Sequence, residues 1–399
     1  MKQIMCVLSV GIIAGSVLLS ACSTNLGPET LPSTTPATEP VVETEPVIET
    51  EPEIPEHTEP YSQAVITGSL VNNYGELSIS GTDITNSEGI KVVLKGISSY
   101  GIQDCGDFFT PEVVKTLAED WGCDVLRIAI TGDQNSDGYV KEPEKYFDTV
   151  CKICDMCVAQ GIYVIVDWNI LYSEEYDENQ ELAVDFFSRL SVIYSDSYNI
   201  IYEINNDPAK PDEELESGEE WDEYIKPFAV SVIDAIRAND PNNIIIVGTP
   251  KKSLDVNAAT ESPLEYSNIA YGCRFFSGPH TDEQRDKISE ALEDEVCVFV
   301  TQWGLTNEYG VGGIHMTESL KWVDFLDKNQ ISWCNYAIGS TSSDDTNALD
   351  LDNDRYTDEQ KNSGHWPVGL ISESGSFVRE QFLKIDTPSD DEETNEDEE

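Results

Sequence analysis

The stretch Ile200-Ile-Tyr-Glu-Ile-Asn-Asn-Asp-Pro208 is an apolar run that ends in polar residues. A second stretch of the same form, Val298-Phe-Val-Thr-Gln-Trp-Gly304, lies further along the chain. Short, nearly continuous apolar runs rich in β-branched residues are typical of parallel strands that are buried on both faces. We therefore expect two buried strands that each deliver polar side chains to one edge of a sheet.

Residues 65–385 repeat this pattern and alternate it with amphipathic segments. The expected strands are 92–96, 125–130, 162–168, 199–204, 243–247, 268–274, 297–302 and 332–337. The expected helices are one starting at Thr110-Pro111, and 143–159, 178–195, 220–237, 281–293 and 315–328. Eight strand–helix units predict a (β/α)8 barrel with its chemistry at the carboxyl ends of the strands. A doubly wound open sheet is the alternative, but no Gly-rich phosphate loop follows the first strand.

A small β-hairpin is expected to precede the barrel. Its strands would be residues 77–80 and 91–94, joined by a turn near residues 86–89.

The two ends of the chain are expected to lie outside this fold. Residues 1–21 form an apolar leader too short to span a bilayer comfortably. Leu19-Ser-Ala-Cys22 resembles a bacterial lipobox, which implies lipid attachment at Cys22; an ordinary secretory signal is the alternative. Residues 22–64 repeat Glu-Pro and predict an extended tether, and residues 386–399 predict an acidic, disordered tail. We therefore expect an extracytoplasmic, membrane-anchored lipoprotein on the bacterial cell surface.

Charge and cysteine content narrow the function further. The chain has 23 Lys and Arg against 76 Asp and Glu, a formal net charge of −53. Such a surface repels nucleic acid, because phosphate binding relies on basic side chains. Cys151, Cys154 and Cys157 recur inside an apolar helical pattern, with no His or fourth Cys at ligand spacing. We interpret them as a buried helix face rather than a metal site.

The two opening stretches resemble the Asn-Glu-Pro and Glu-Trp-Gly motifs of glycoside hydrolase family 5, the cellulase and endoglucanase family. The resemblance covers roughly residues 68–385. It implies that position 207 is the acid/base and position 302 the nucleophile. Both family glutamates are replaced, by Asp207 and by Gln302.

Other strand ends resemble the same family, in order along the chain. Lys95-Gly-Ile-Ser-Ser-Tyr-Gly101 carries Tyr100 for the usual His, and Val166-Asp-Trp-Asn169 carries Asn169 for His. Tyr271-Gly-Cys-Arg-Phe-Phe276 carries Arg274 for His and Phe276 for Tyr, and Cys334-Asn-Tyr336 carries Tyr336 for Trp. The resemblance implies that these residues, with Arg127, Asn206 and Trp303, bind substrate. Packing alone is the alternative reason for Arg127, Asn206 and Trp303. Asp104 and Lys252 stand where the family usually has tryptophans.

The substitutions fall where the chemistry would be. Retaining hydrolysis needs two carboxyl groups about 5–5.5 Å apart. The amide of Gln302 is neutral and a poor nucleophile. Asp207 is one methylene shorter than Glu, and Arg274 is expected to pair with it and hold it ionised. The sequence therefore favours a pseudo-glycosidase that binds a β-linked glucan, or a protein partner, without turnover.

Two alternatives stay open. In a rewired endo-β-glucanase, Asp207 would act as acid or base while Asp104, Glu308 or Asp344 replaces the nucleophile, or water attacks with inversion. A scaffold with no affinity for sugar is the other.

No cofactor is required for any of these functions. Residues 133–144 fit the oxygen-donor spacing of a calcium loop, with Asp133, Asn135, Asp137, Tyr139 and Glu144 as candidate ligands. A plain solvated loop is the alternative, since Lys141 and Pro143 suit a ligand cage poorly.

Overall fold

The computed structural model describes residues 68–132, 138–169, 176–208, 215–342 and 344–384, without the side chains of residues 176–178. Cys22, Asp133, Asn135 and Asp137 lie outside the described residues, as do the predicted signal peptide, tether and acidic tail.

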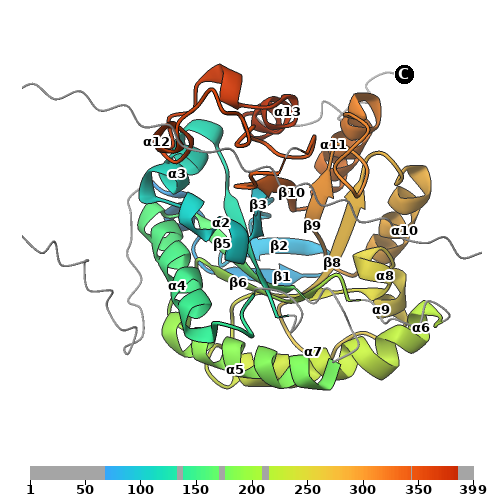
Figure 1. Cartoon of the computed structure of the whole chain (residues 1–399). Helices are drawn as coiled ribbons and strands as arrows, with labels where there is room; N and C mark the ends of the chain where they lie inside the picture. The colour runs from blue at the N-terminus through green and yellow to red at the C-terminus, as the bar shows by residue number, and fades with distance from the viewer. Residues whose placement is uncertain (1–67, 133–137, 170–175, 209–214, 343, 385–399) are drawn as a thin grey trace, which may run out of the picture. The chain divides into compact units, whose positions relative to one another are not determined.

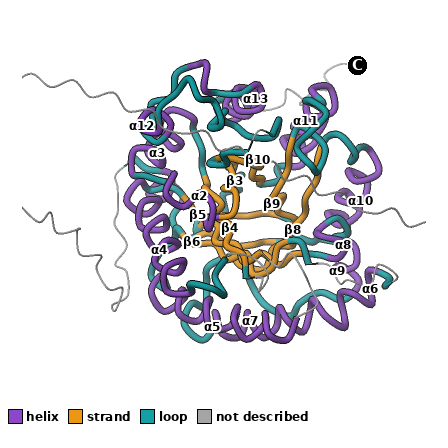
Figure 2. The backbone as a smooth tube through the Cα atoms, in the orientation of Figure 1, coloured by secondary structure: helices purple, strands orange, loops and turns teal. Residues whose placement is uncertain are grey.

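Eight parallel strands close into a barrel in the order β10-β3-β4-β5-β6-β7-β8-β9 (Figures 1 and 2). They are β3 (Lys95–Gly101), β4 (Val125–Thr131), β5 (Tyr163–Asn169), β6 (Ile200–Asn206), β7 (Ile245–Gly248), β8 (Ile269–Phe276), β9 (Val298–Gly304) and β10 (Trp333–Ile338). Helices surround the barrel on its outer side (Figure 2). The predicted (β/α)8 fold is therefore confirmed.

The strands are apolar because both of their faces are covered. All seven residues of β4 are buried, and β4 pairs with β5 in one unbroken register from Val125↔Tyr163 to Thr131↔Asn169. This register fixes which side chains reach the carboxyl end of the barrel.

The outer helices match most of the expected segments. The longer ones are α4 (Pro143–Gln160), α5 (Tyr176–Tyr194), α7 (Lys226–Arg237), α10 (Asp282–Glu293), α11 (Met316–Asn329) and α13 (Glu373–Phe382). The shorter ones are α1 (Leu70–Tyr74), α2 (Ile102–Cys105), α3 (Pro111–Thr116), α6 (Ser217–Glu220), α8 (Pro250–Ser253), α9 (Asn257–Glu261) and α12 (Asp358–Lys361). Thr110 caps α3 as predicted, since its hydroxyl accepts the backbone N–H of Val113 at 3.2 Å.

A hairpin closes the amino-terminal end of the barrel. Strands β1 (Leu77–Ser80) and β2 (Asp83–Asn86) pair antiparallel, and their apolar side chains pack with the starts of the barrel strands. The backbone N–H of Ile79 donates to Oδ1 of Asn268, just before β8, at 3.0 Å. The predicted hairpin is therefore present, at the end of the barrel away from the strands' carboxyl termini.

Two strand boundaries differ from the prediction. The second hairpin strand is Asp83–Asn86 rather than 91–94, because the chain already turns at Gly81 (φ 61°). The first barrel strand is Lys95–Gly101 rather than 92–96, because Val92 and Leu94 pack beneath the barrel with the hairpin instead.

The eight cysteines of the described chain are all buried free thiols. Cys151, Cys154 and Cys157 lie on the core side of α4, which confirms the helix-face interpretation. No helix in the described ranges is long and apolar enough to cross a membrane.

Candidate active site

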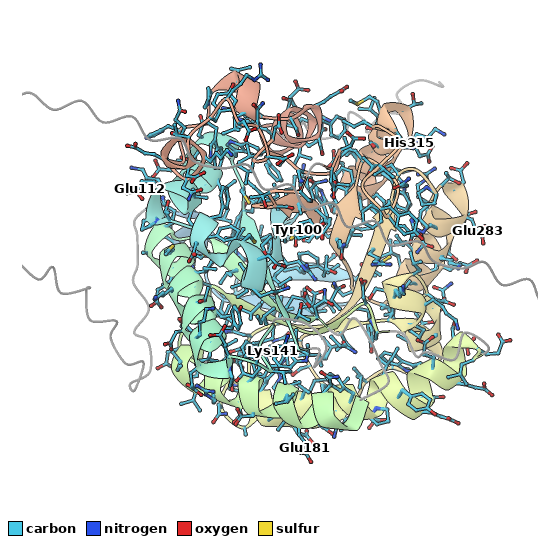
Figure 3. The ribbon with its side chains drawn as sticks, viewed as in Figure 1. Tyr100, Glu112, Lys141, Glu181, Glu283 and His315 are labelled. Atoms are coloured by element: carbon cyan, nitrogen blue, oxygen red, sulfur yellow. The ribbon has the colours of Figure 1, made fainter. Side chains whose placement is uncertain are left out.

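A cleft of about 400 Å³ opens at the carboxyl ends of the strands. It is lined by Tyr100, Asp207, Lys252, Arg274, Phe276, Gln302, Glu308, Tyr309, Gly310, Tyr336, Asp344 and Thr346. Figure 3 shows Tyr100 near the centre of the barrel, whereas Glu112, Glu181 and Glu283 lie on the outer helices. A larger hollow of about 980 Å³ lies on the flank beside α3 and α13, away from these strand ends. Six of the predicted site residues therefore converge on the smaller cleft: Tyr100, Asp207, Arg274, Phe276, Gln302 and Tyr336.

Gln302 is near the end of β9 and is 7% exposed. Its Oε1 accepts a hydrogen bond from Nδ2 of Asn206 at 3.3 Å. Asn206 is itself buried at the end of β6 and orients this amide from behind, outside the cleft lining. The position that the family resemblance assigns to the nucleophile therefore presents a neutral side chain.

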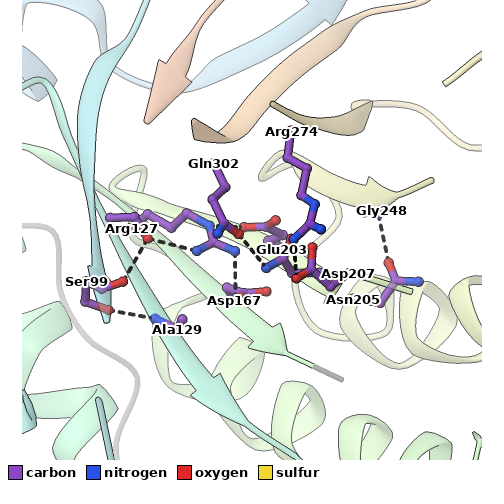
Figure 4. Close-up of polar contacts among 12 residues, drawn as sticks. Ser99, Arg127, Ala129, Asp167, Glu203, Asn205, Asp207, Gly248, Arg274 and Gln302 are labelled. Atoms are coloured by element: carbon purple, nitrogen blue, oxygen red, sulfur yellow. Dashed lines mark hydrogen bonds and ion pairs between the residues drawn. The ribbon is translucent and has the colours of Figure 1, made fainter. Parts of the chain in front are cut away.

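Asp207 directly follows β6 and has a left-handed backbone, with φ of 54°. Its Oδ2 lies 2.6 Å from Nη1 of Arg274 (Figure 4). Burial raises the pKa of Asp207 above its ordinary value, and the lowering by Arg274, Arg127 and Lys252 does not cancel this rise. The expected pair is thus present, and Arg274 lowers the pKa of Asp207 as expected, but burial outweighs this lowering and leaves the pKa above its ordinary value.

Arg127 lies beneath the cleft rather than in it. Its Nε donates to Oε2 of Glu203 at 2.6 Å, its Nη2 lies 2.8 Å from Oδ2 of Asp167, and its Nη1 donates to Ser98 Oγ at 2.9 Å (Figure 4). Burial raises the pKa of Asp167, and Arg127 opposes that rise. Arg127 is 1% exposed, so its placement supports packing and charge compensation rather than contact with a substrate.

Glu203 is a buried partner of Arg127 beneath the cleft that the sequence analysis missed. A glutamate in the middle of the apolar run of β6 was the available signal. A buried carboxylate needs a cationic partner, and Arg127 on β4 provides it.

The aromatic residues divide between cleft and core. The rings of Tyr100 and Tyr336 stack at 5.3 Å, and Phe276 meets Tyr336 edge-on at 6.4 Å. Trp303 has no exposed surface and packs on Phe275 in the core, with 5.5 Å between the centroids of the two rings. Its placement does not support contact with a substrate.

Asn169 ends β5, half-buried and outside the cleft lining. Its Oδ1 is buried without a hydrogen-bond partner among the described residues.

Two of the three candidate replacement carboxylates reach the cleft. Glu308 and Asp344 line it, whereas Asp104 lines a separate small hollow beside Phe108 and Gly339. Oδ1 of Asp344 accepts the backbone N–H of Thr346 at 2.8 Å, which orients this carboxylate.

The described part of the calcium candidate has other partners. Tyr139 is buried, with its ring 5.2 Å from that of Trp168, and Glu144 forms an ion pair with Arg189 at 2.8 Å. Calcium binding stays a prediction.

Comparison with known proteins places the chain in a family. The model of the cellulases, glycosyl hydrolase family 5, matches residues 85–342. An endoglucanase of Clostridium saccharobutylicum is 38% identical over 315 residues, which are 79% of this chain and 66% of the relative. Endoglucanase A of Evansella cellulosilytica is 36% identical over 321 residues, 80% of this chain and 62% of the relative. The chain thus spans slightly less than two thirds of the length of these curated relatives.

Solved structures agree. The catalytic domain of Thermobifida fusca endoglucanase Cel5A superposes with a TM-score of 0.71 at 29% identity, over 79% of this chain and 100% of that domain. The same domain is known as a Glu-to-Gln variant in complex with cellotetraose, also with a TM-score of 0.71. The family match covers more than half of the chain and includes every strand of the barrel. The protein therefore belongs to the cellulase family, glycoside hydrolase family 5.

Proposed function

We propose that the cleft binds a β-linked glucan and does not cleave it by the double-displacement route of retaining glycosidases. The observation that carries this proposal is the amide of Gln302 at the strand end where the family resemblance expects the nucleophile. An amide neither attacks the anomeric carbon nor stabilises positive charge on the sugar ring. Loss of a nucleophile costs on the order of 10⁴-fold or more in turnover.

Binding of a glucan is supported independently of turnover. The relatives are endoglucanases, and the Thermobifida fusca domain binds cellotetraose as a Glu-to-Gln variant. The cleft combines the aromatic rings of Tyr100 and Tyr336 with polar side chains that can bind sugar hydroxyls.

The second candidate is an active, rewired endo-β-glucanase, and the comparisons favour it over the first, because the relatives are endoglucanases by name. Two features of the cleft also support it. Burial raises the pKa of Asp207, which helps a carboxyl to keep its proton and act as a general acid. Glu308 and Asp344 line the same cleft and could activate a water molecule for inverting attack.

Release of reducing sugar from a soluble, neutral β-glucan separates the two candidates. For the first, we expect no release by the wild-type protein, while cellotetraose still raises its melting temperature. Hydrolysis that is abolished in Asp207→Ala and weakened in Glu308→Gln or Asp344→Asn would establish the second candidate. If no oligosaccharide changes the melting temperature, the remaining alternative is a scaffold without affinity for sugar.

We also propose that the protein is extracytoplasmic and anchored through a lipid on Cys22. The lipobox-like sequence supports this location. Cys22→Ala should move the protein from the membrane fraction to the soluble fraction. A protein partner at the cell surface and a calcium ion at residues 133–144 are further proposals. If a chelator leaves the melting temperature unchanged, the proposal of a bound calcium ion is wrong.

A further inference from the structure

Tyr309 is a cleft residue that the family resemblance does not assign. It lies in the loop between β9 and α11, lines the cleft, and is 75% exposed. Single exposed aromatic residues are ordinary on protein surfaces, so exposure alone indicates nothing. The surroundings of Tyr309 distinguish it from such cases.

The loop that carries Tyr309 is held on both sides. Oδ1 of Asn307 accepts the backbone N–H of Tyr309 at 2.9 Å and that of Val311 at 3.2 Å. The carbonyl of Gly310 accepts the N–H of Asp345 at 2.8 Å, from the loop after β10. Tyr309 is therefore displayed by an organised turn, and little conformational entropy is lost when a ligand contacts it.

Glycine at position 310 makes this arrangement possible. Its φ is +69°, and a Cβ there would overlap the carboxyl group of Asp344. The loop can therefore approach Asp344 only with glycine next to Tyr309.

The other cleft aromatics are already engaged with one another. Tyr100 stacks on Tyr336, and Phe276 meets Tyr336 edge-on. Within the described residues, the ring of Tyr309 has no such aromatic partner and no cation over its face. Tyr309 thus offers the cleft an uncovered aromatic face.

We propose that Tyr309 is a stacking platform for one sugar ring of a β-linked glucan bound in the cleft. The inference rests on the proposed glucan binding and adds a specific contact to it. Pyranose rings present apolar C–H groups on their faces, which pack on an aromatic ring as other apolar groups do. Glu308 lies beside Tyr309 in the cleft, and the hydrogen bond between the two side chains raises the pKa of the Tyr309 hydroxyl.

Calorimetric titration of the full chain with cellotetraose tests the platform. Tyr309→Ala should weaken binding by about three- to ten-fold, the range expected for loss of one aromatic contact. Tyr309→Phe keeps the ring and should bind as the wild type does. Tyr198→Ala is the matched control, since Tyr198 is 42% exposed in the turn before β6, at the closed end of the barrel.

The outcomes separate the two levels of inference. If the wild-type protein binds and Tyr309→Ala binds equally well, the platform is wrong while glucan binding stands. If Tyr309→Phe loses as much affinity as Tyr309→Ala, the hydroxyl acts instead of the ring, and stacking is again wrong. If the wild-type protein binds no cello-oligosaccharide, the proposed function fails and the platform with it. Equal melting temperatures of all variants would show that the fold is intact.

Discussion

Position 302 differs from a carboxylate by one group, an NH2 in place of an oxygen. Its neighbours in the cleft also bear on any catalysis there. Asp207 is shorter than Glu and lies 2.6 Å from Arg274, and Arg274 pairs with Gln302 in the register of β8 and β9. A carboxylate restored at position 302 would therefore find both a short acid and a neighbouring cation.

This arrangement predicts the effect of placing glutamates at positions 302 and 207. Gln302→Glu alone should release little reducing sugar from a neutral β-glucan. The double variant Gln302→Glu/Asp207→Glu should release about 10²-fold more, because the added methylene returns the acid by about 1 Å. Gln302→Ala/Asp207→Glu is the control without a nucleophile. Equal rates for the single and double variants would contradict the role given to the length of Asp207.

The pKa of Asp207 predicts a pH dependence of stability. Its folded-state pKa is raised above the ordinary 3.8, so its contribution to the free energy of unfolding is complete below about pH 3.8. That contribution is lost as pH rises through the folded-state pKa. The melting temperature of the wild type, minus that of Asp207→Asn, should therefore fall as pH rises.

An exposed aspartate provides the matched control. Ion pairing with Arg285 lowers the pKa of Asp282, so its contribution is lost as pH falls. The melting temperature of the wild type, minus that of Asp282→Asn, should therefore rise as pH rises. The same slope for both variants would mean that Asp207 does not titrate as burial predicts.

Sequence reasoning located the site residues at strand ends, and on the loops it named Glu308 and Asp344 but missed Tyr309. The family resemblance pointed to five residues at strand ends, and strand register brings them to one cleft: Tyr100, Arg274, Phe276, Gln302 and Tyr336. Loop positions have no such register, which is why Tyr309 was not found. Periodicity also could not say that Arg127 and Trp303 lie behind the cleft floor, since buried strands are covered on both faces.

At the scale of elements, the barrel strands were predictable and the hairpin only in part. Seven of the eight expected barrel strands overlap the observed ones over most of their length. Val92 and Leu94 misled the prediction of β3, because apolar residues beneath the barrel resemble strand residues within it. The polar Ser98 and Ser99 lie inside β3, and the hydroxyl of Ser99 accepts the N–H of Ala129 at 3.0 Å.

The hairpin predicts a separable effect on stability. Ile84 on β2 is 4% exposed and packs in the apolar cluster below the barrel. Ile84→Ala should lower the free energy of unfolding by about 2–5 kcal/mol. Ile90→Ala, at a position 52% exposed, should change it by less than about 0.5 kcal/mol.

Denaturant unfolding measures both variants, and cellotetraose titration shows whether the cleft is affected. Because the hairpin lies at the far end of the barrel, Ile84→Ala should leave affinity unchanged. Equal stability of the two variants would mean that the hairpin does not belong to the cooperative core.

At the scale of the whole molecule, the charge of −53 predicts a preference among the glucans that the proposed function allows. The cleft adds to it locally, with Asp207, Glu308 and Asp344 against Lys252 and Arg274. Like charges repel over roughly 10 Å at 0.1 M salt, and higher salt screens them.

We therefore expect weaker binding to a carboxymethylated glucan than to a neutral hydroxyethylated one at low salt. Raising the salt concentration from about 0.01 to 1 M, where the screening length falls from about 30 to 3 Å, should narrow the difference. Affinity electrophoresis or titration over the same salt series measures both ligands. Tighter binding of the anionic polymer at low salt would contradict the electrostatic argument.

The hairpin beneath the barrel marks the side on which the protein can be attached to a surface or to a fusion partner. The described chain begins close to α1, where the N–H of Val71 donates to the carbonyl of Gly161 ahead of β5. Near its other end, Leu383 lies beside Gly122 ahead of β4. Both ends of the described chain thus lie on the side of the barrel that the hairpin closes. A sensor surface or fusion partner attached there would leave the cleft at the opposite end facing solvent. A long polymer could then reach the cleft without steric hindrance from the attachment.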